Sequence, residues 1–208
     1  MEINVHDIVK FSSVNQLYDQ TTIPAWVAHS PAATSYGVVR RAPITKQLVP
    51  IGLRGNARHE RHGTAIDKQY ILEIITPYSL IEQLAHFKNN RFYSLLNDIR
   101  HKFDPYTIKW GATGSVGFEL ATGIQVTSIT SDLDLLICLE VIDEVLLHEI
   151  SNLLADSRIT IDPQIEIPGV GAFLLKDYLM NKESGFILRT FYGPQLCKIK
   201  EGSIQLFL

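Results

Sequence analysis

The chain has 208 residues, of which 46% are hydrophobic and 20% are charged, which is ordinary for a globular protein of one large or two small domains. The formal net charge of −3 excludes a general attraction to nucleic acid or acidic membranes, so any basic site must be local. No apolar run reaches the ~18 residues of a membrane helix, and the first residues lack a signal-peptide pattern. Cys138 and Cys197 have no metal-site spacing. We therefore expect a cytoplasmic protein with reduced thiols.

The first part of the chain, to about residue 75, is expected to form mostly strands and turns. Short β-like runs bounded by Gly and Pro predict strands in YGVVRRAP, QLVPIGLRG and YILEIITP. Between the last two lies RGNARHERHGTA, whose Arg54, Arg58 and Arg61 would share one face if this segment were helical. We expect residues 1–76 to form a smaller β-rich N-terminal domain that carries a basic patch.

The remainder, residues 77–208, is expected to alternate helices with strands. Thr76 and Pro77 favour a helix start, and apolar residues recur at helical spacing on both sides of Asn89-Asn90. Further along, strands are predicted up to Trp110 and in DLDLLICLE, ITIDPQIEI and GFILRTFY. Helices are predicted in VGFELATG, VIDEVLLHEISNLLADS and GAFLLKDYLM. This alternation predicts an α/β (α+β) layered fold.

Two aspartates lie at the start of a predicted hydrophobic strand. Asp132 and Asp134 are two residues apart, so on a strand they project from the same face. Two like charges held so close repel each other unless a cation neutralises them, and such a pair suits Mg²⁺. Taken alone, Asp-x-Asp is more often a solvated turn.

A second predicted strand strengthens the case for a metal site. ITIDPQIEI carries Asp162, Gln164 and Glu166 on one face. If the two strands are neighbours, a third carboxylate completes a two-metal site. Glu166 lies about 13 Å from Asp162 at ~3.3 Å per residue, so both cannot share one site. Asp162 is preferred as the third carboxylate, with Glu166 as the alternate.

Gly114 and Ser115 add an element suited to phosphate. A glycine turn exposes backbone N–H groups, the start of the following helix adds positive potential, and the Ser115 hydroxyl can donate a hydrogen bond to a phosphate oxygen. The pair is weak evidence by itself, and it gains specificity from the strand with two aspartates that follows.

These residues resemble a known signature. Gly114-Ser115, Asp132-Leu133-Asp134 and Ile161-Asp162 look like the G-S…D-x-D…D pattern of the polymerase-β-type nucleotidyltransferases, whose members bind a nucleoside triphosphate with two Mg²⁺. More closely, VVRRAP, VPIGLRG, WGATGSVGFELATG, TSDLDLLI and IDPQIEIPGVGAFLL resemble the family of malonate decarboxylase holo-(acyl carrier protein) synthase, or phosphoribosyl-dephospho-CoA transferase. The resemblance covers roughly Trp26 to Gly193 and implies a nucleotidyltransferase-like mixed sheet in residues 77–208.

The resemblance also implies a reaction. The donor would be 2′-(5″-triphosphoribosyl)-3′-dephospho-CoA, the acceptor a serine of the malonate decarboxylase acyl carrier protein, and the product pyrophosphate. Asp132, Asp134 and Asp162 would be the catalytic and metal-binding residues for two Mg²⁺ ions, with Asp162 also able to accept the serine proton. Gly114 and Ser115 would hold the triphosphate.

The arginines of the first part are candidates for donor binding. Arg40, Arg41, Arg54 and Arg58 lie in a short region, and guanidinium groups suit phosphate. A solvated charged face and docking of an acidic carrier protein are the other two interpretations. Arg40 and Arg41, adjacent on a predicted strand, favour a functional role because at least one of them needs a polar partner.

Two other functions compete with the carrier-protein transferase. One is a Mg²⁺-dependent nucleotidyltransferase that uses ATP or another nucleoside triphosphate on a different acceptor. The other is a non-catalytic binding module, which is disfavoured because Gly114, Ser115, Asp132 and Asp134 are all present.

Overall fold

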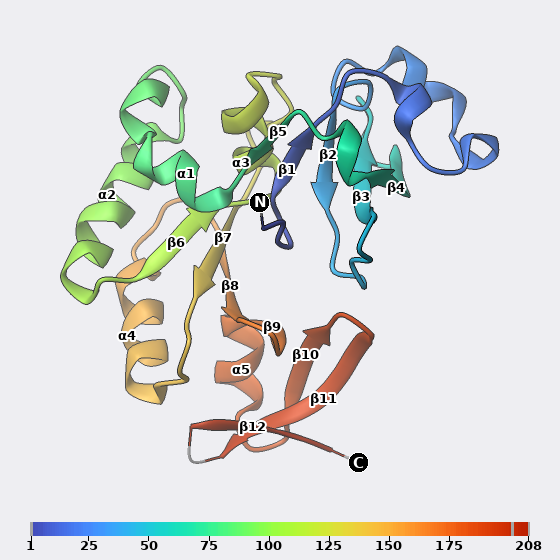
Figure 1. Ribbon diagram of the computed structural model, residues 1–208. Helices are drawn as coiled ribbons and strands as arrows, with labels where there is room; N and C mark the ends of the chain where they lie inside the picture. Colours follow the sequence, from blue (N-terminus) through green and yellow to red (C-terminus); the bar gives the residue numbers. More distant parts are fainter. Residues whose placement is uncertain (1, 201, 208) are drawn as a thin grey trace. The chain divides into compact units, whose positions relative to one another are not determined.

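The computed structural model describes residues 2–200 and 202–207 (Figure 1). The chain divides into two compact units: unit 1 comprises residues 1–76 and 118–126, and unit 2 comprises residues 77–117 and 127–208. The described part contains two sheets and five α-helices, which confirms the predicted α+β class. None of its helices combines the length and the hydrophobicity that crossing a membrane requires.

Unit 1 is built on a five-stranded antiparallel sheet with the order β4-β3-β2-β1-β5. The strands are β1 (Ile8–Lys10), β2 (Tyr36–Val39), β3 (Leu48–Arg54), β4 (Arg61–Asp67) and β5 (Glu73–Ile75). Short 3-10 helices lie between them at Val14–Gln16, Gln20–Thr22, Ala25–His29 and Lys68–Tyr70.

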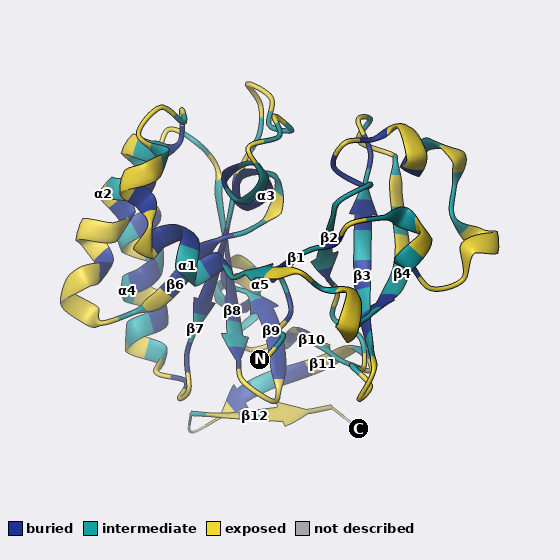
Figure 2. Cartoon of the chain, turned by 45° about the horizontal axis from the view of Figure 1, so that its top comes forward, coloured by how far each residue is buried: buried dark blue, intermediate teal, exposed yellow. Residues whose placement is uncertain are grey.

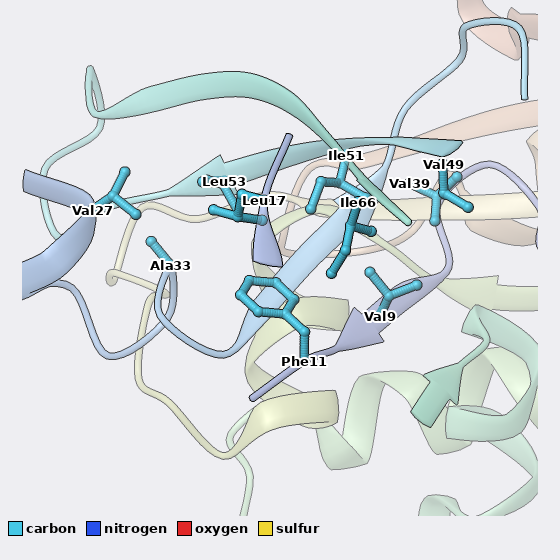
Figure 3. Close-up of a cluster of buried hydrophobic side chains, with 10 residues drawn as sticks. All are labelled: Val9, Phe11, Leu17, Val27, Ala33, Val39, Val49, Ile51, Leu53 and Ile66. Atoms are coloured by element: carbon cyan, nitrogen blue, oxygen red, sulfur yellow. The ribbon is translucent and has the colours of Figure 1, made fainter. Parts of the chain in front are cut away.

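Alternation along β3 places the core of unit 1 on one face of this sheet. Val49, Ile51 and Leu53 are buried, whereas the residues between them are only partly buried. They pack with Phe11 and Ile66 in a cluster of ten buried side chains that Figure 3 shows. The buried set of that cluster is Val9, Phe11, Leu17, Val27, Ala33, Val39, Val49, Ile51, Leu53 and Ile66.

The structure confirms the strands predicted for unit 1 and corrects two other expectations for it. The strands predicted in YGVVRRAP, QLVPIGLRG and YILEIITP are confirmed as β2, β3 and β5. The segment RGNARHERHGTA is not helical, because β3 ends at Arg54, a turn follows, and β4 begins at Arg61. Arg40 and Arg41 lie just beyond the end of β2, so the argument from alternation along a strand does not hold for them.

Unit 2 is built on a seven-stranded mixed sheet with the order β12-β11-β10-β9-β8-β7-β6, in which β7 and β8 are parallel and the other neighbours antiparallel. The strands are β6 (Lys109–Ala112), β7 (Leu133–Cys138), β8 (Ile161–Ile167), β9 (Gly171–Leu174), β10 (Phe186–Thr190), β11 (Gly193–Lys200) and β12 (Ser203–Leu206).

The helices follow the predicted order. They are α1 (Pro77–Glu82), α2 (Tyr93–Phe103), α3 (Gly114–Thr122), α4 (Glu144–Leu154) and α5 (Leu175–Asn181), with 3-10 helices at Leu84–Phe87 and Asp104–Tyr106. Asp143 caps α4 by accepting hydrogen bonds from the backbone N–H groups of Val145 and Leu146, at 2.9 and 3.2 Å. In unit 2, α2 contacts α4, α4 contacts α5, and α5 packs against β8, β9 and β10.

The core of unit 2 holds β7 rigidly. Leu133, Leu135 and Ile137 are fully buried, and β7 is dark blue over most of its length in Figure 2. Near β10, Phe173, Tyr178 and Phe186 form an aromatic cluster with ring centroids 4.8–5.9 Å apart. A strand buried this well fixes the direction of the polar residues at its start.

Two predictions for the C-terminal part are wrong. The predicted helix GAFLLKDYLM begins only at Leu175, because its first four residues form β9 and pair with β8. The strand predicted in GFILRTFY is confirmed as β10, but it is not the last one, since β11 and β12 follow it. Gly193-Pro194 therefore begins a new strand.

Candidate functional site

The two aspartates at the head of β7 differ in their surroundings. Asp132 precedes the strand and is exposed, whereas Asp134 is its second residue and is partly buried. Leu133 lies between them and is fully buried. The alternation of the strand therefore places both carboxylates on the face opposite to the side chain that anchors this end of β7.

The parallel neighbour β8 brings Asp162 to the same place. In the register of the two strands, Asp134 lies opposite Asp162, and Glu166 lies opposite Cys138, four residues further along. Residues opposite each other on parallel strands point to the same face, with backbones about 4.8 Å apart. Asp162 therefore adjoins Asp134, while Glu166 lies further along the sheet.

The surroundings of Asp134 raise the pKa of its carboxyl group. Burial raises the pKa of its carboxyl group above the ordinary value, and the negative charges of Asp132 and Asp162 raise it further. Lys176 and Arg189 act in the opposite direction and lower this pKa. The net shift is upward, and burial is its largest cause.

Gly114 lies directly against this carboxylate. The backbone N–H of Thr113 donates a hydrogen bond of 2.9 Å to the carbonyl oxygen of Asp134, which ties the end of β6 to β7. Gly114 then turns the chain into α3 with a φ of +61°, a value that favours glycine. A β-carbon on Gly114 would overlap Oδ2 of Asp134 and lie 2.7 Å from Cγ.

The start of α3 therefore meets the carboxylates. Gly114 is exposed and Ser115 is partly buried, and they are the first two residues of the helix. The first N–H groups of a helix have no intrahelical partner, and they carry the positive end of the helix dipole. An anion at this point would lie against the first N–H groups of α3 and beside the carboxylates.

Sequence reasoning missed two basic residues near the carboxylates. Lys176, in α5, places its Nζ 2.5 Å from Oδ1 of Asp162, and this contact raises the pKa of the lysine. Arg189, in β10, donates a hydrogen bond of 3.1 Å to Oε1 of Gln164. No local motif marks either residue, because Lys176 reaches this site through the packing of α5 against β8, and Arg189 through the pairing of β10 with β9, the neighbour of β8.

The donor groups fit one metal ion better than two. Within residues 2–200 and 202–207, no group of three or more His, Cys, Asp and Glu side chains is placed to hold a metal ion. Asp162 is paired with Lys176. Asp132 and Asp134 are hard oxygen donors of the kind that Mg²⁺ prefers, and the charge of Asp132 acts on Asp134.

The predicted arginines all belong to unit 1, whereas the glycine, serine and carboxylates belong to unit 2. Arg54 ends β3 and Arg61 begins β4, and the two lie opposite each other in the register. Arg58 lies in the turn between them, and Arg40 and Arg41 follow β2.

Comparison with known families covers nearly the whole chain. The family described as phosphoribosyl-dephospho-CoA transferase MdcG C-terminal domain matches residues 79–200, and the corresponding N-terminal domain family matches residues 4–77. No solved structure matches the chain.

Curated relatives agree with these families. A phosphoribosyl-dephospho-CoA transferase of Klebsiella pneumoniae (strain 342) is 32% identical over 195 residues, which is 92% of this chain and 92% of the relative. Another, of Pseudomonas fluorescens, is 33% identical over 159 residues, 74% of each chain. A third, of Pseudomonas aeruginosa, is 37% identical over 115 residues, 55% of each chain.

The family models and the curated relatives that match this chain are those of transferases, so this α+β protein is a transferase. The chain belongs to the phosphoribosyl-dephospho-CoA transferase family, as its resemblance in sequence predicts.

Proposed function

We propose that this transferase moves the 2′-(5″-phosphoribosyl)-3′-dephospho-CoA group from its triphosphate donor to a serine of the malonate decarboxylase acyl carrier protein. The family supports transfer of a dephospho-CoA derivative. The observation that carries the chemistry is the contact of Gly114, at the start of α3, with Asp134 at the head of β7. This contact supports the proposal because it sets a helix start that suits a phosphate chain beside two carboxylates that suit a metal ion.

In this reaction the serine hydroxyl oxygen attacks the α-phosphorus of the triphosphate. A new phosphorus–oxygen bond forms, the bond to the β-phosphate breaks, and pyrophosphate leaves. Asp132 and Asp134 would hold Mg²⁺, which when bound neutralises phosphate charge and lowers the pKa of the attacking hydroxyl. Gly114 and Ser115 would donate hydrogen bonds to the outer phosphate oxygens.

Asp162 is proposed to accept the proton of the serine hydroxyl; the alternate, Glu166, is disfavoured because it lies opposite Cys138, four residues further along the sheet. The ion pair with Lys176 orients the Asp162 carboxylate and supplies a positive charge beside the phosphates. The second Mg²⁺ expected from the resemblance would have to displace Lys176 from Asp162. Arg189, which also acts on Asp134, adds a second fixed cation at this end of the sheet.

The test mixes the enzyme with apo carrier protein, the triphosphate donor and Mg²⁺. We expect the carrier mass to rise by the phosphoribosyl-dephospho-CoA group and an equal amount of pyrophosphate to appear. Asp132→Asn and Asp134→Asn should abolish both signals, while Asp156→Asn, at an exposed position, should not. Labelling of an acceptor from ATP alone would instead indicate a general nucleotidyltransferase, and tight carrier binding without a mass change would indicate a binding module.

A further inference from the structure

A group of arginines gathers on the face of the unit 1 sheet that is opposite to the core. On β3, Leu53 faces the core, so Gly52 and Arg54 lie on the other face. Across the hairpin, Gly52 pairs with Gly63, and Arg54 pairs with Arg61. Because residues opposite each other share a face, the two arginines lie side by side next to two glycines.

Arg40 lies on these glycines. A β-carbon on Gly63 would overlap Nη1 of Arg40 and lie 2.9 Å from its Cζ, and a β-carbon on Gly52 would lie 3.5 Å from its Cδ. The paired glycines thus form a flat surface that fits a guanidinium group. We call Arg40, Arg54 and Arg61 the arginine face, and Arg58 lies in the turn of the same hairpin.

Arg54 is the most constrained member of the arginine face. Its Cζ lies 5.2 Å from the ring centroid of Phe118, which belongs to the same unit. Its Nε is buried and has no hydrogen-bond acceptor among the described residues. Burial, together with the charge of Arg61, lowers the pKa of Arg54 to about 10. A buried N–H donor without an acceptor is costly, so the side chain is set up for a partner that is not part of the fold.

Two carboxylates whose charges act on these arginines also accept hydrogen bonds from the backbone. Glu60 accepts a hydrogen bond of 2.8 Å from the N–H of Ala57, and Glu119 accepts one of 3.1 Å from the N–H of Val126. Arg61 donates to the carbonyl oxygens of Ala57 and Glu60, which are neutral. The charge of Glu119 raises the pKa of Arg54 and that of Glu60 raises the pKa of Arg61, but neither offsets the lowering by burial.

We infer that the arginine face is a phosphate-binding site of unit 1, and that its ligand is the diphosphate bridge of the dephospho-CoA group. A phosphate group offers several acceptor oxygens in a tetrahedral arrangement, so one can accept from the Nε of Arg54 while the others accept paired hydrogen bonds from the two exposed guanidinium groups. A single carboxylate of an acidic protein has only two oxygens, both in one plane, too few to serve Arg54 and both exposed guanidinium groups at once. The choice of dephospho-CoA as the ligand rests on the proposed function. Binding of a phosphate group by the arginine face is inferred from the arginines alone.

The test measures binding alone, by calorimetry on the full chain with EDTA present and without carrier protein. The probes are 3′-dephospho-CoA, inorganic pyrophosphate and pantetheine, which has no phosphate. We expect Arg54→Met to weaken dephospho-CoA and pyrophosphate about tenfold or more, and pantetheine to bind no variant measurably. Arg158→Met removes an exposed arginine elsewhere and should change nothing.

A second variant moves a charge without removing it. Gly63→Val should displace Arg40 from the glycines and weaken dephospho-CoA severalfold, with the fold checked by circular dichroism. Unchanged affinity for 3′-dephospho-CoA and pyrophosphate in folded Arg54→Met and Gly63→Val would overturn the inference. Asp134→Asn should abolish transfer and leave dephospho-CoA binding unchanged, so failure of the site and failure of the proposed reaction are distinguishable.

Discussion

The α-carbon of Gly114 lies so close to the carboxyl group of Asp134 that a β-carbon there would be 2.7 Å from the Asp134 Cγ. Gly114 also has a φ of +61°, which L-residues with side chains rarely adopt. The glycine therefore allows the first turn of α3 to meet the carboxylate without an intervening side chain.

Gly114→Ala is expected to lower transfer activity about 100-fold or more, because the added methyl group displaces the Asp134 carboxylate. Gly123→Ala is a matched control: Gly123 has a φ of +70°, but a β-carbon there meets nothing within 4 Å. Both variants should lose about 1 kcal/mol of stability from backbone strain, measured by urea unfolding. Equal activities of the two variants would contradict this role of Gly114.

Asp134→Asn should stabilise the fold at neutral and alkaline pH. The folded-state pKa of Asp134 is raised above its ordinary value, so the folded chain binds this proton more readily than the unfolded chain does. Stability is therefore lost as pH rises through the folded pKa, and the loss is absent below the ordinary pKa of aspartate.

The measurement is the melting temperature of both proteins from pH 4 to pH 8. Asp134 is partly exposed, so we expect a gain of up to about 2 °C for the variant at pH 8, which shrinks as pH falls. Asp156→Asn, at an exposed position, should show no such trend. A variant less stable than the parent at pH 8 would show that the carboxylate is favourably paired.

The strand that carries these aspartates could be predicted from local pattern, whereas several other strands could not. β7 is an apolar run that is buried on both faces, which makes it visible in a sequence. β4 is an edge strand with only Ile66 buried, so its residues RHGTAID show no clear apolar alternation. β12 is an edge strand of the seven-stranded sheet, and this short strand has no buried residue.

The same distinction applies to the candidate site. Gly114, Asp132 and Asp134 are marked by their own sequence neighbourhood. Lys176 belongs to the predicted helix GAFLLKDYLM, and nothing local shows that α5 carries it to Asp162. Arg54 and Arg61 pair across a hairpin, and their i, i+7 spacing in the sequence fits that arrangement as well as a shared helix face.

Mg²⁺ should stabilise the parent protein through Asp132 and Asp134. A ligand that binds only the folded chain raises stability by about 2.7 kcal/mol when its concentration is 100 times its dissociation constant. We therefore expect millimolar Mg²⁺ to raise the melting temperature by several degrees, and Asp132→Asn to remove the rise. Asp98→Asn, an acidic residue of α2, is the control. An equal rise in all three proteins would indicate a nonspecific salt effect.

Lys176→Met should separate metal binding from transfer. Without the lysine, the carboxylate of Asp162 is free to join Asp134, so Mn²⁺ affinity measured by electron paramagnetic resonance should rise. Transfer should fall about 10- to 100-fold because a fixed positive charge beside the phosphates is lost. Lys176→Arg should restore part of the activity.

Lys182 provides the control for this prediction. It pairs with Glu144, next to Tyr178, and its replacement by Met removes an ion pair without touching the carboxylates. Lys182→Met should therefore leave both Mn²⁺ affinity and transfer unchanged. A fall in Mn²⁺ affinity in Lys176→Met would show that the lysine supports the metal site and does not compete with a metal ion for Asp162.

The two cysteines should differ sharply in reactivity. Cys197 lies in β11, is fully buried, and burial raises the pKa of its thiol to about 11, whereas Cys138 is partly exposed. Since the thiolate is the reactive form, Cys197 should react with a disulfide reagent at pH 8 only when the chain opens. Cys197→Ser should keep the faster reaction of the native protein, and Cys138→Ser should remove it. Rapid labelling of Cys197 in the folded Cys138→Ser variant would mean that the β10–β11 hairpin opens readily in solution.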